Sequence, residues 1–104
     1  MRTYFLGCYA PGALKGLIAG SDREAAVKKL LESVGGKFVS LSFTRGEFDI
    51  VLIADVPDMA TAAGATMAIG ASGAFTKMVV LNELDMKPVL DAAQKVAAAY
   101  TPAG

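Results

Sequence analysis

The amino-acid sequence predicts an α+β fold of the ferredoxin-like βαββαβ type, with an antiparallel sheet covered by helices on one face and an added C-terminal helix. Two observations lead to this prediction: strand-like and helix-like segments alternate in that order, and Arg45-Gly46 joins two strand-like runs as a hairpin would. With 104 residues, the chain is long enough for one domain with a substantial core. We expect a single domain over residues 1–104, with the extra helix at residues 85–100 and a frayed tail at residues 101–104.

The first half of the chain contains a strand, a connection and a helix. Residues 3–9 are rich in aromatic and apolar side chains and predict a strand, which the turn signal Ala10-Pro11-Gly12 ends. A loop or short helix follows as far as Gly20. The segment Ser21-Asp22-Arg23-Glu24 has the spacing of a capping box, and apolar residues recur behind it at helical intervals. We therefore expect a helix that Gly35-Gly36 ends.

The two strand-like runs at residues 37–44 and 47–56 define the faces of the sheet. A two-residue hairpin in which Thr44 faces Glu47 makes one face uniformly apolar and leaves the other mixed. The apolar face would pair Phe43 with Phe48, Leu41 with Ile50 and Val39 with Leu52, and the mixed face Ser42 with Asp49, Ser40 with Val51 and Phe38 with Ile53. Helices can cover the first face, whereas the second must meet solvent, a ligand or another subunit.

The second half of the chain continues with a helix, a strand and the additional helix. Pro57-Asp58 opens a helix of small residues that ends near Gly70 or Gly73, and residues 75–84 predict the fourth strand. Asp85 can cap the last helix. The apolar residues of that helix recur on one side: Val89, Leu90, Ala93, Val96, Ala97 and Tyr100.

The composition argues against several classes of function. Ten basic and ten acidic residues cancel, so we expect neither nucleic acid nor a membrane as a partner. The chain has no histidine, which excludes histidine-dependent nucleophiles and histidine-ligated zinc or haem, and we predict no cofactor and no metal. The single cysteine, Cys8, cannot form an internal disulfide, and the first residues lack the apolar region of a signal peptide. We expect a reduced, cytoplasmic protein.

Four short segments carry a family resemblance: Leu14-Lys15-Gly16, Gly35-Gly36-Lys37, Gly46-Glu47-Phe48-Asp49 and Pro57-Asp58. Through them, nearly the full chain resembles the GYD domain family, in the dimeric α/β-barrel group of ferredoxin-like folds. Phe48 stands where the family signature has Tyr, so only Gly46 and Asp49 of that signature carry over. The resemblance implies the fold and self-association, as a homodimer or higher oligomer, with sheets packed face to face.

Four residues are candidates for binding a ligand: Tyr9, Ser42, Asp49 and Lys77. Asp49, on the mixed face beside Ser42, could be desolvated and act as a base, or it could brace the hairpin or an interface. Lys77 could hold an anionic group or pair with Asp49. The alternation of the strand does not decide on which face of the sheet Lys77 lies. Tyr9 could position a carbonyl, stack on an aromatic ligand or lie in an interface. Neighbouring Cys8, on the opposite face, is expected to be a buried, inert thiol.

Functions from different classes fit these observations. The main hypothesis is a small homo-oligomer that uses its mixed sheet face as a structural module or to bind a small apolar metabolite, because Phe38, Val51 and Ile53 are too apolar for exposure. The alternative is a cofactor-independent enzyme, monooxygenase-like or isomerase-like, that acts on a small aromatic or polyketide-like compound with Asp49 as its base. That alternative rests on the fold resemblance. Effector sensing at a subunit interface is a third hypothesis.

Overall fold

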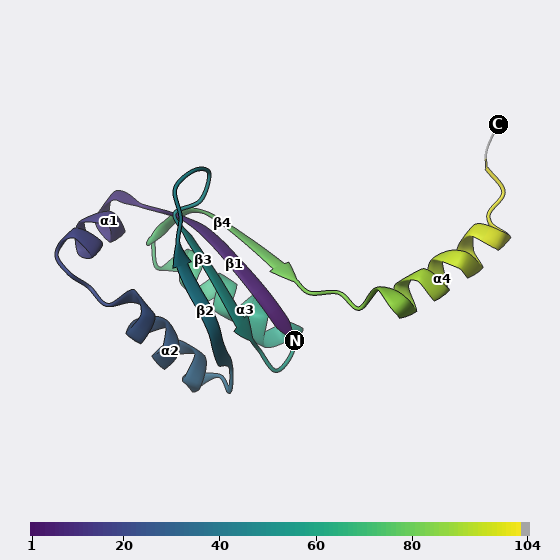
Figure 1. The fold of residues 1–104 in the computed structure, drawn as a ribbon, viewed down its shortest axis with the longest axis horizontal. Helices are drawn as coiled ribbons and strands as arrows, with labels where there is room; N and C mark the ends of the chain where they lie inside the picture. The colour runs from purple at the N-terminus through teal and green to yellow at the C-terminus, as the bar shows by residue number, and fades with distance from the viewer. Residues whose placement is uncertain (103–104) are drawn as a thin grey trace.

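Four strands and four helices make up residues 1–102, the part of the chain that the computed structural model describes (Figure 1). In chain order they are β1 (Arg2–Tyr9), α1 (Pro11–Ile18), α2 (Arg23–Ser33), β2 (Lys37–Phe43), β3 (Ile50–Asp55), α3 (Met59–Ala71), β4 (Phe75–Asn82) and α4 (Met86–Ala99). The strands form one antiparallel sheet in the order β2-β3-β1-β4, so the predicted ferredoxin-like fold class is confirmed. Of the predicted tail, Ala103 and Gly104 lie outside the described residues.

Local sequence explains where the helices begin and end. Asp22, Asp58 and Asp85 precede α2, α3 and α4, and each carboxylate accepts a hydrogen bond from a backbone N–H of the first turn, at 3.0, 2.8 and 3.2 Å. Gly35 follows α2 with a φ of 72°, the left-handed conformation that ends many helices. The predicted helix start at Pro57-Asp58 and the predicted cap at Asp85 are confirmed. The cap of α2 is Asp22 rather than Ser21 of the predicted capping box, and the connection before Gly20 is a short helix, α1.

The hairpin between β2 and β3 differs from the prediction. Strand pairing stops at Phe43, which faces Ile50 rather than Phe48, and residues 44–49 form a loop. The predicted two-residue turn is wrong because such a turn generally needs a positive φ at the first central residue. Within the described chain only glycines have a positive φ, so Gly46 meets this requirement and Arg45 does not.

The register is shifted by an even number of residues, which leaves most side chains of β2 and β3 on their predicted faces. A bulge between Phe38 and Ser40 is the exception. It leaves Val39 exposed and without a register partner, and it turns Phe38 toward the helix side, opposite Ala54. The predicted positions of Phe38 on the mixed face and of Val39 opposite Leu52 are therefore wrong.

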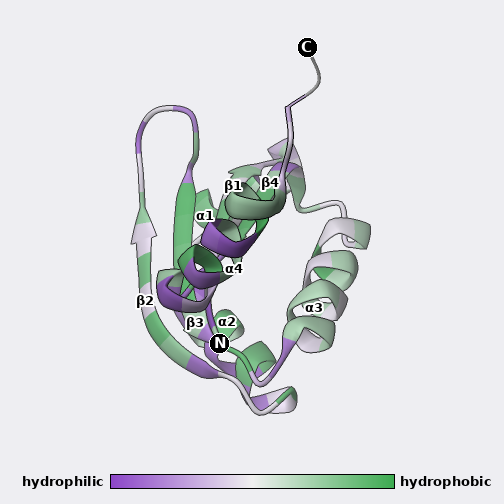
Figure 2. Cartoon of the chain, turned by 90° about the vertical axis from the view of Figure 1, so that its right-hand side faces the viewer, coloured by the Kyte–Doolittle hydropathy of each residue, from purple (hydrophilic) through white to green (hydrophobic). Residues whose placement is uncertain are grey.

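Two helices cover one side of the sheet, each over a different edge. α2 packs on the edge strand β2, and α3 packs on the opposite edge strand β4 (Figure 1). Figure 2 shows the strands and α3 as separate layers, with α4 projecting from the body toward the viewer. A core cluster lies between α2, α3 and the sheet: Leu31, Ala54, Val56 and Ala62, with Val27 and Phe38 packed against it. The middle strands, β1 and β3, hold the buried apolar residues of the sheet.

The other side of the sheet carries no helix within residues 1–102, and we call it the open sheet face. By strand register, its apolar residues are Tyr4, Leu6, Val51, Ile53, Val79 and Leu81. Charged residues lie at its margins, and two pairs form within the chain: Arg2 with Asp55 and Lys77 with Glu47, both at 3.0 Å. Lys37 lies opposite Asp55 at the same margin. The Arg2 guanidinium, through its hydrogen bond and charge, lowers the pKa of Asp55. The centre of the face is thus apolar.

Replacing Gly7 with alanine should destabilise the fold, because the ring of Phe75 occupies the space that a Cβ atom would take. That Cβ would lie 2.5 Å from Phe75 Cε1, and the ring stacks on Tyr9 with centroids 4.9 Å apart, so it cannot move freely. We expect a loss of about 1–3 kcal/mol in the free energy of unfolding, measured by urea denaturation.

The matched control is Gly64→Ala in α3, where an added Cβ meets nothing within 4 Å. There we expect a gain of about 0.4–1 kcal/mol, because alanine is the better helix former and restricts the unfolded chain. Effects of the same sign at both positions would contradict the packing assigned to Gly7.

Candidate functional site

An apolar cavity of about 180 Å³ lies between the sheet and the helices α2 and α3. It exists because the two helices stand over opposite edges, so that β1 and β3 form its floor. The side chains that line it include Phe5, Tyr9, Ile50 and Leu52 from the floor, Val27 and Leu30 from α2, Ile69 from α3, and Phe75 and Met78 from β4. An apolar protein cavity of roughly 150 Å³ holds benzene. The volume here therefore suits a molecule of about one ring.

Arg23, the first residue of α2, is the charged side chain among the residues that line the cavity. Its Nη2 donates a hydrogen bond to the carbonyl of Ala13 at 3.0 Å, and its guanidinium carbon lies 5.6 Å from the centroid of the Tyr9 ring. Its Nε–H is buried and has no hydrogen-bond partner among the described residues. A buried donor without an acceptor costs roughly 1–3 kcal/mol. The arginine thus holds one unused donor in otherwise apolar surroundings.

Two aromatic side chains form a wall of the cavity beside Arg23. Tyr9 is 6% exposed, and its ring stacks on Phe75 with an interplanar angle of 23°. Burial raises the pKa of the Tyr9 hydroxyl, and the positive charge of Arg23 offsets part of that rise. The tyrosine is therefore neutral near pH 7, and the wall offers a π surface for stacking next to a fixed positive charge.

Asp49 ties the hairpin loop to the end of β1. Its Oδ2 accepts a hydrogen bond from the Tyr9 N–H at 2.9 Å, and its own N–H donates to the carbonyl of Gly7 at 2.8 Å. The predicted pairing of Asp49 with Ser42 is wrong, because the shifted register places Ser42 opposite Val51. The carboxylate is not among the groups that line the cavity, and it touches the site through the backbone of Tyr9.

Ser42 and Lys77 lie on the open sheet face, on the other side of the sheet from the cavity. Lys77 is opposite Cys8 in the register, and its Nζ lies 3.0 Å from the Glu47 carboxylate rather than pairing with Asp49. Glu47, by its hydrogen bond and charge, raises the pKa of Lys77. The Cys8 thiol is half-buried and donates to the Glu47 carbonyl at 2.9 Å. Lys77 and Cys8 thus bind Glu47 of the hairpin loop at one end of the open sheet face.

Of the four candidate residues, the structure places Tyr9 in the cavity and leaves Ser42, Asp49 and Lys77 outside its lining. Sequence reasoning missed Arg23, which it treated only as part of a capping box. A signal was present: Arg23, Val27 and Leu30 follow the helical spacing i, i+4 and i+7, which puts the arginine on the apolar side of α2. Nothing local marked Phe75, because its stacking on Tyr9 depends on the β1–β4 register.

Two further observations concern membrane-spanning helices and metal-ligating side chains. None of the helices within residues 1–102 has the length and apolarity needed to cross a membrane. In the same residues, acidic and thiol side chains do not gather in groups of three or more that could hold a metal ion.

Comparison with known proteins gives one match. Residues 5–93 match the family model described as GYD domain, from β1 into α4, which confirms the resemblance predicted from the sequence. No curated protein and no solved structure matches the chain.

Replacing Asp49 with alanine should weaken the fold more than replacing it with asparagine. Alanine removes the acceptor of the Tyr9 N–H, and we expect a loss of about 1–3 kcal/mol in the free energy of unfolding. Asparagine keeps an acceptor oxygen in the same place, so its loss should be at most half as large. Urea denaturation measures both, and hydrogen exchange of the Tyr9 amide should accelerate in the alanine variant. Equal losses, with unchanged exchange at Tyr9, would contradict the bracing role.

Proposed function

The chain belongs to the GYD domain family, and we propose that it binds a small, largely apolar molecule in the cavity between the sheet, α2 and α3. One observation supports this most directly: Arg23, the charged side chain among those that line the cavity, has a buried Nε–H without a partner in the described residues. Folding removes this donor from water, and no atom of the described residues accepts its hydrogen bond. A ligand with a carbonyl or carboxylate oxygen would supply the acceptor.

The chemistry of the walls narrows the ligand class. Apolar side chains and the stacked rings of Tyr9 and Phe75 favour an aromatic or compact aliphatic body, and the volume of about 180 Å³ limits it to about one ring. The positive charge of Arg23 favours an anionic acceptor over a neutral one. The ligand best matched to this site is therefore a single-ring or short-chain carboxylic acid.

The geometry favours binding over turnover. Among the side chains that line the cavity, the guanidinium of Arg23 only donates hydrogen bonds, and burial raises the pKa of Tyr9, so neither is suited to act as a base near pH 7. Asp49, the candidate base, lies outside the lining, and its carboxylate accepts a hydrogen bond from the Tyr9 N–H. We therefore place the chain among small-molecule-binding proteins.

We further infer that the chain self-associates through the open sheet face, with a second copy as the partner. The supporting observation is the group of six apolar residues that defines this face, of which Leu81 is 53% exposed. Two charge pairs at its margins, Arg2 with Asp55 and Lys77 with Glu47, are formed within the chain, and the centre between them is apolar. A face with an apolar centre and paired margins is self-complementary, as a two-fold interface requires.

The ligand proposal predicts that Arg23→Gln lowers the affinity for benzoate, used as the probe, by about 10–100-fold, because a hydrogen bond to a charged group is lost. Isothermal titration calorimetry measures the affinity, and toluene serves as a probe without an acceptor. The matched control is Lys28→Gln, an exposed charge on the same helix that pairs with Glu24. Equal affinity of the native chain for benzoate and toluene, or an equal loss in both variants, would refute the role of Arg23.

The self-association proposal predicts that Val51→Glu gives a monomer at micromolar concentration, whereas the native chain sediments as a dimer or larger species. Val51 lies opposite Leu6 in the middle of the open sheet face, where a buried carboxylate would have no partner. Val34→Glu is the control, because Val34 is an exposed valine at the end of α2, away from this face. A native chain that sediments as a monomer would end the proposal.

A further inference from the structure

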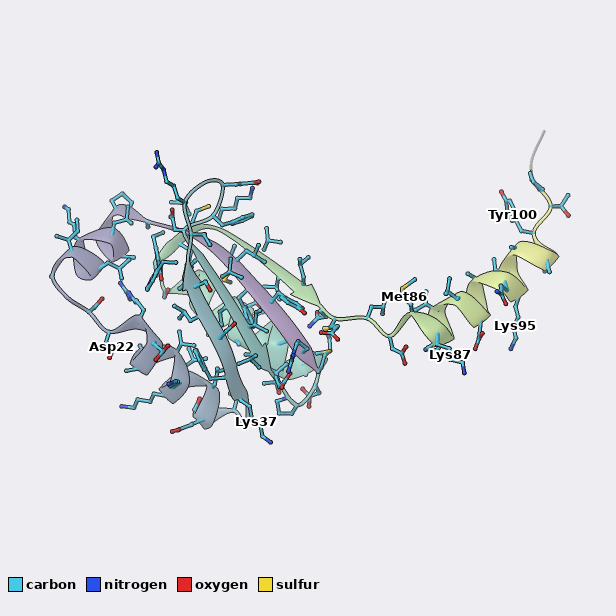
Figure 3. All side chains as sticks on the ribbon, viewed as in Figure 1. Asp22, Lys37, Met86, Lys87, Lys95 and Tyr100 are labelled. Carbon is cyan, nitrogen blue, oxygen red and sulfur yellow. The ribbon has the colours of Figure 1, made fainter. Side chains whose placement is uncertain are left out.

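Helix α4 stands apart from the rest of the subunit. All of its residues, Met86–Ala99, are exposed, and the helix extends away from the sheet (Figures 1 and 3). The radius of gyration is 17.7 Å. A compact domain of about 100 residues has a radius of gyration near 13 Å, so the chain is far more extended than a single packed domain. The difference comes from α4, which projects along the longest axis of the molecule.

The sequence of α4 is nevertheless that of a helix with a partner. We call Val89, Leu90, Ala93, Val96 and Ala97 the α4 stripe, since their helical spacing puts them on one side. Figure 3 shows Lys87 and Lys95 pointing to one side of the helix and Met86 and Tyr100 to the other. A lone helix of 14 residues is marginal in water, and most helices in proteins are stabilised by packing an apolar side.

The connection to β4 directs α4 away from its own subunit. Glu83 is held at the end of β4, because its N–H donates to the Arg2 carbonyl at 2.9 Å and its carboxylate accepts a hydrogen bond from Tyr4 at 3.0 Å. Asp85 caps α4 through the Lys87 N–H. Leu84 is thus the sole residue between two anchored positions. This short connection leaves α4 pointing away from its own sheet, and all of its residues are exposed.

We propose that α4 is an exchanged arm whose α4 stripe packs on a second copy of this chain. The proposal rests on self-association through the open sheet face and names an additional contact in it. Two-fold symmetry makes the exchange reciprocal, because each subunit that gives an arm also receives one. The exposed apolar residues of α4 and the anchored connection then have one common explanation.

Interface size supports the second copy as the occupant. Given the usual strand spacing and rise, a four-stranded sheet of this length presents roughly 450 Å² on one face, so two faces in contact bury on the order of 900 Å². Stable interfaces bury about 1,200–2,000 Å² in total. A helix of this length docked on one side adds on the order of 400 Å² per arm, and two arms bring the total to about 1,700 Å². With the arms, the buried area therefore reaches the range of a stable dimer interface.

Isotope-filtered NMR on the full chain tests the proposal. In a 1:1 mixture of ¹³C-labelled and unlabelled protein, we expect intermolecular contacts from the methyl groups of Val89, Leu90 and Val96. Contacts confined to the same chain, or none, would overturn the exchanged arm. Intermolecular contacts from Val51 and Ile53 without any from α4 would leave self-association standing and the arm refuted. Absence of both sets would refute both proposals.

A matched pair of variants gives a second, independent measurement. Ala93→Glu puts a carboxylate in the middle of the α4 stripe, and Ala98→Glu makes the same change on the side that carries Asp91 and Lys95. Sedimentation should show a dimer dissociation constant at least tenfold higher for Ala93→Glu and less than threefold higher for Ala98→Glu. Both substitutions make the same change in helix propensity, so equal effects would overturn the proposal.

Discussion

The register of strand β1 determines which side chains of the sheet point to the helices and which to the open sheet face, because β1 pairs with β3 along one edge and with β4 along the other. Its alternating side chains put Phe5 and Tyr9 toward the cavity and Tyr4 and Leu6 toward the open sheet face. A slip of one residue would exchange the two sets and disrupt both surfaces. Both ends of β1 are held: the Met1 amino group donates to the Val56 carbonyl at 2.7 Å, and Asp49 accepts from the Tyr9 N–H.

The cavity is a consequence of placing one helix over each edge strand. Protein interiors are usually close-packed, and cavities left by truncated side chains cost about 24 cal/mol per Å³. The cavity here is partly open to solvent, so its apolar walls lack part of their packing partners. The unpaired Nε–H of Arg23 adds to this cost. A ligand that fills the space and accepts that hydrogen bond would recover part of both terms.

The fold could be predicted from local signals because each element carries its own: aspartate caps before the helices, a glycine after α2, and alternation in the strands. The hairpin register could not, because it depends on which residues accept a positive φ, and Gly46 alone in its turn does so. Because the shift was even, most side chains of β2 and β3 kept their predicted faces, and the bulge at Phe38 and Val39 is the exception. The site was harder to foresee. Tyr9 meets Arg23 and Phe75 only after α2 and β4 pack on the same strand, and their positions in the sequence are far apart.

The proposed self-association would link folding to association through the distribution of the apolar surface. The open sheet face and the α4 stripe together hold a large share of its apolar side chains, and neither has a partner among the described residues of one subunit. When the partner of such surfaces is another copy, the free energy of unfolding includes the free energy of association and depends on protein concentration. The cavity differs, because its walls come from one chain. The proposed ligand would therefore stabilise the subunit itself. The strands β1 and β3 carry the cavity floor on one side and the open sheet face on the other.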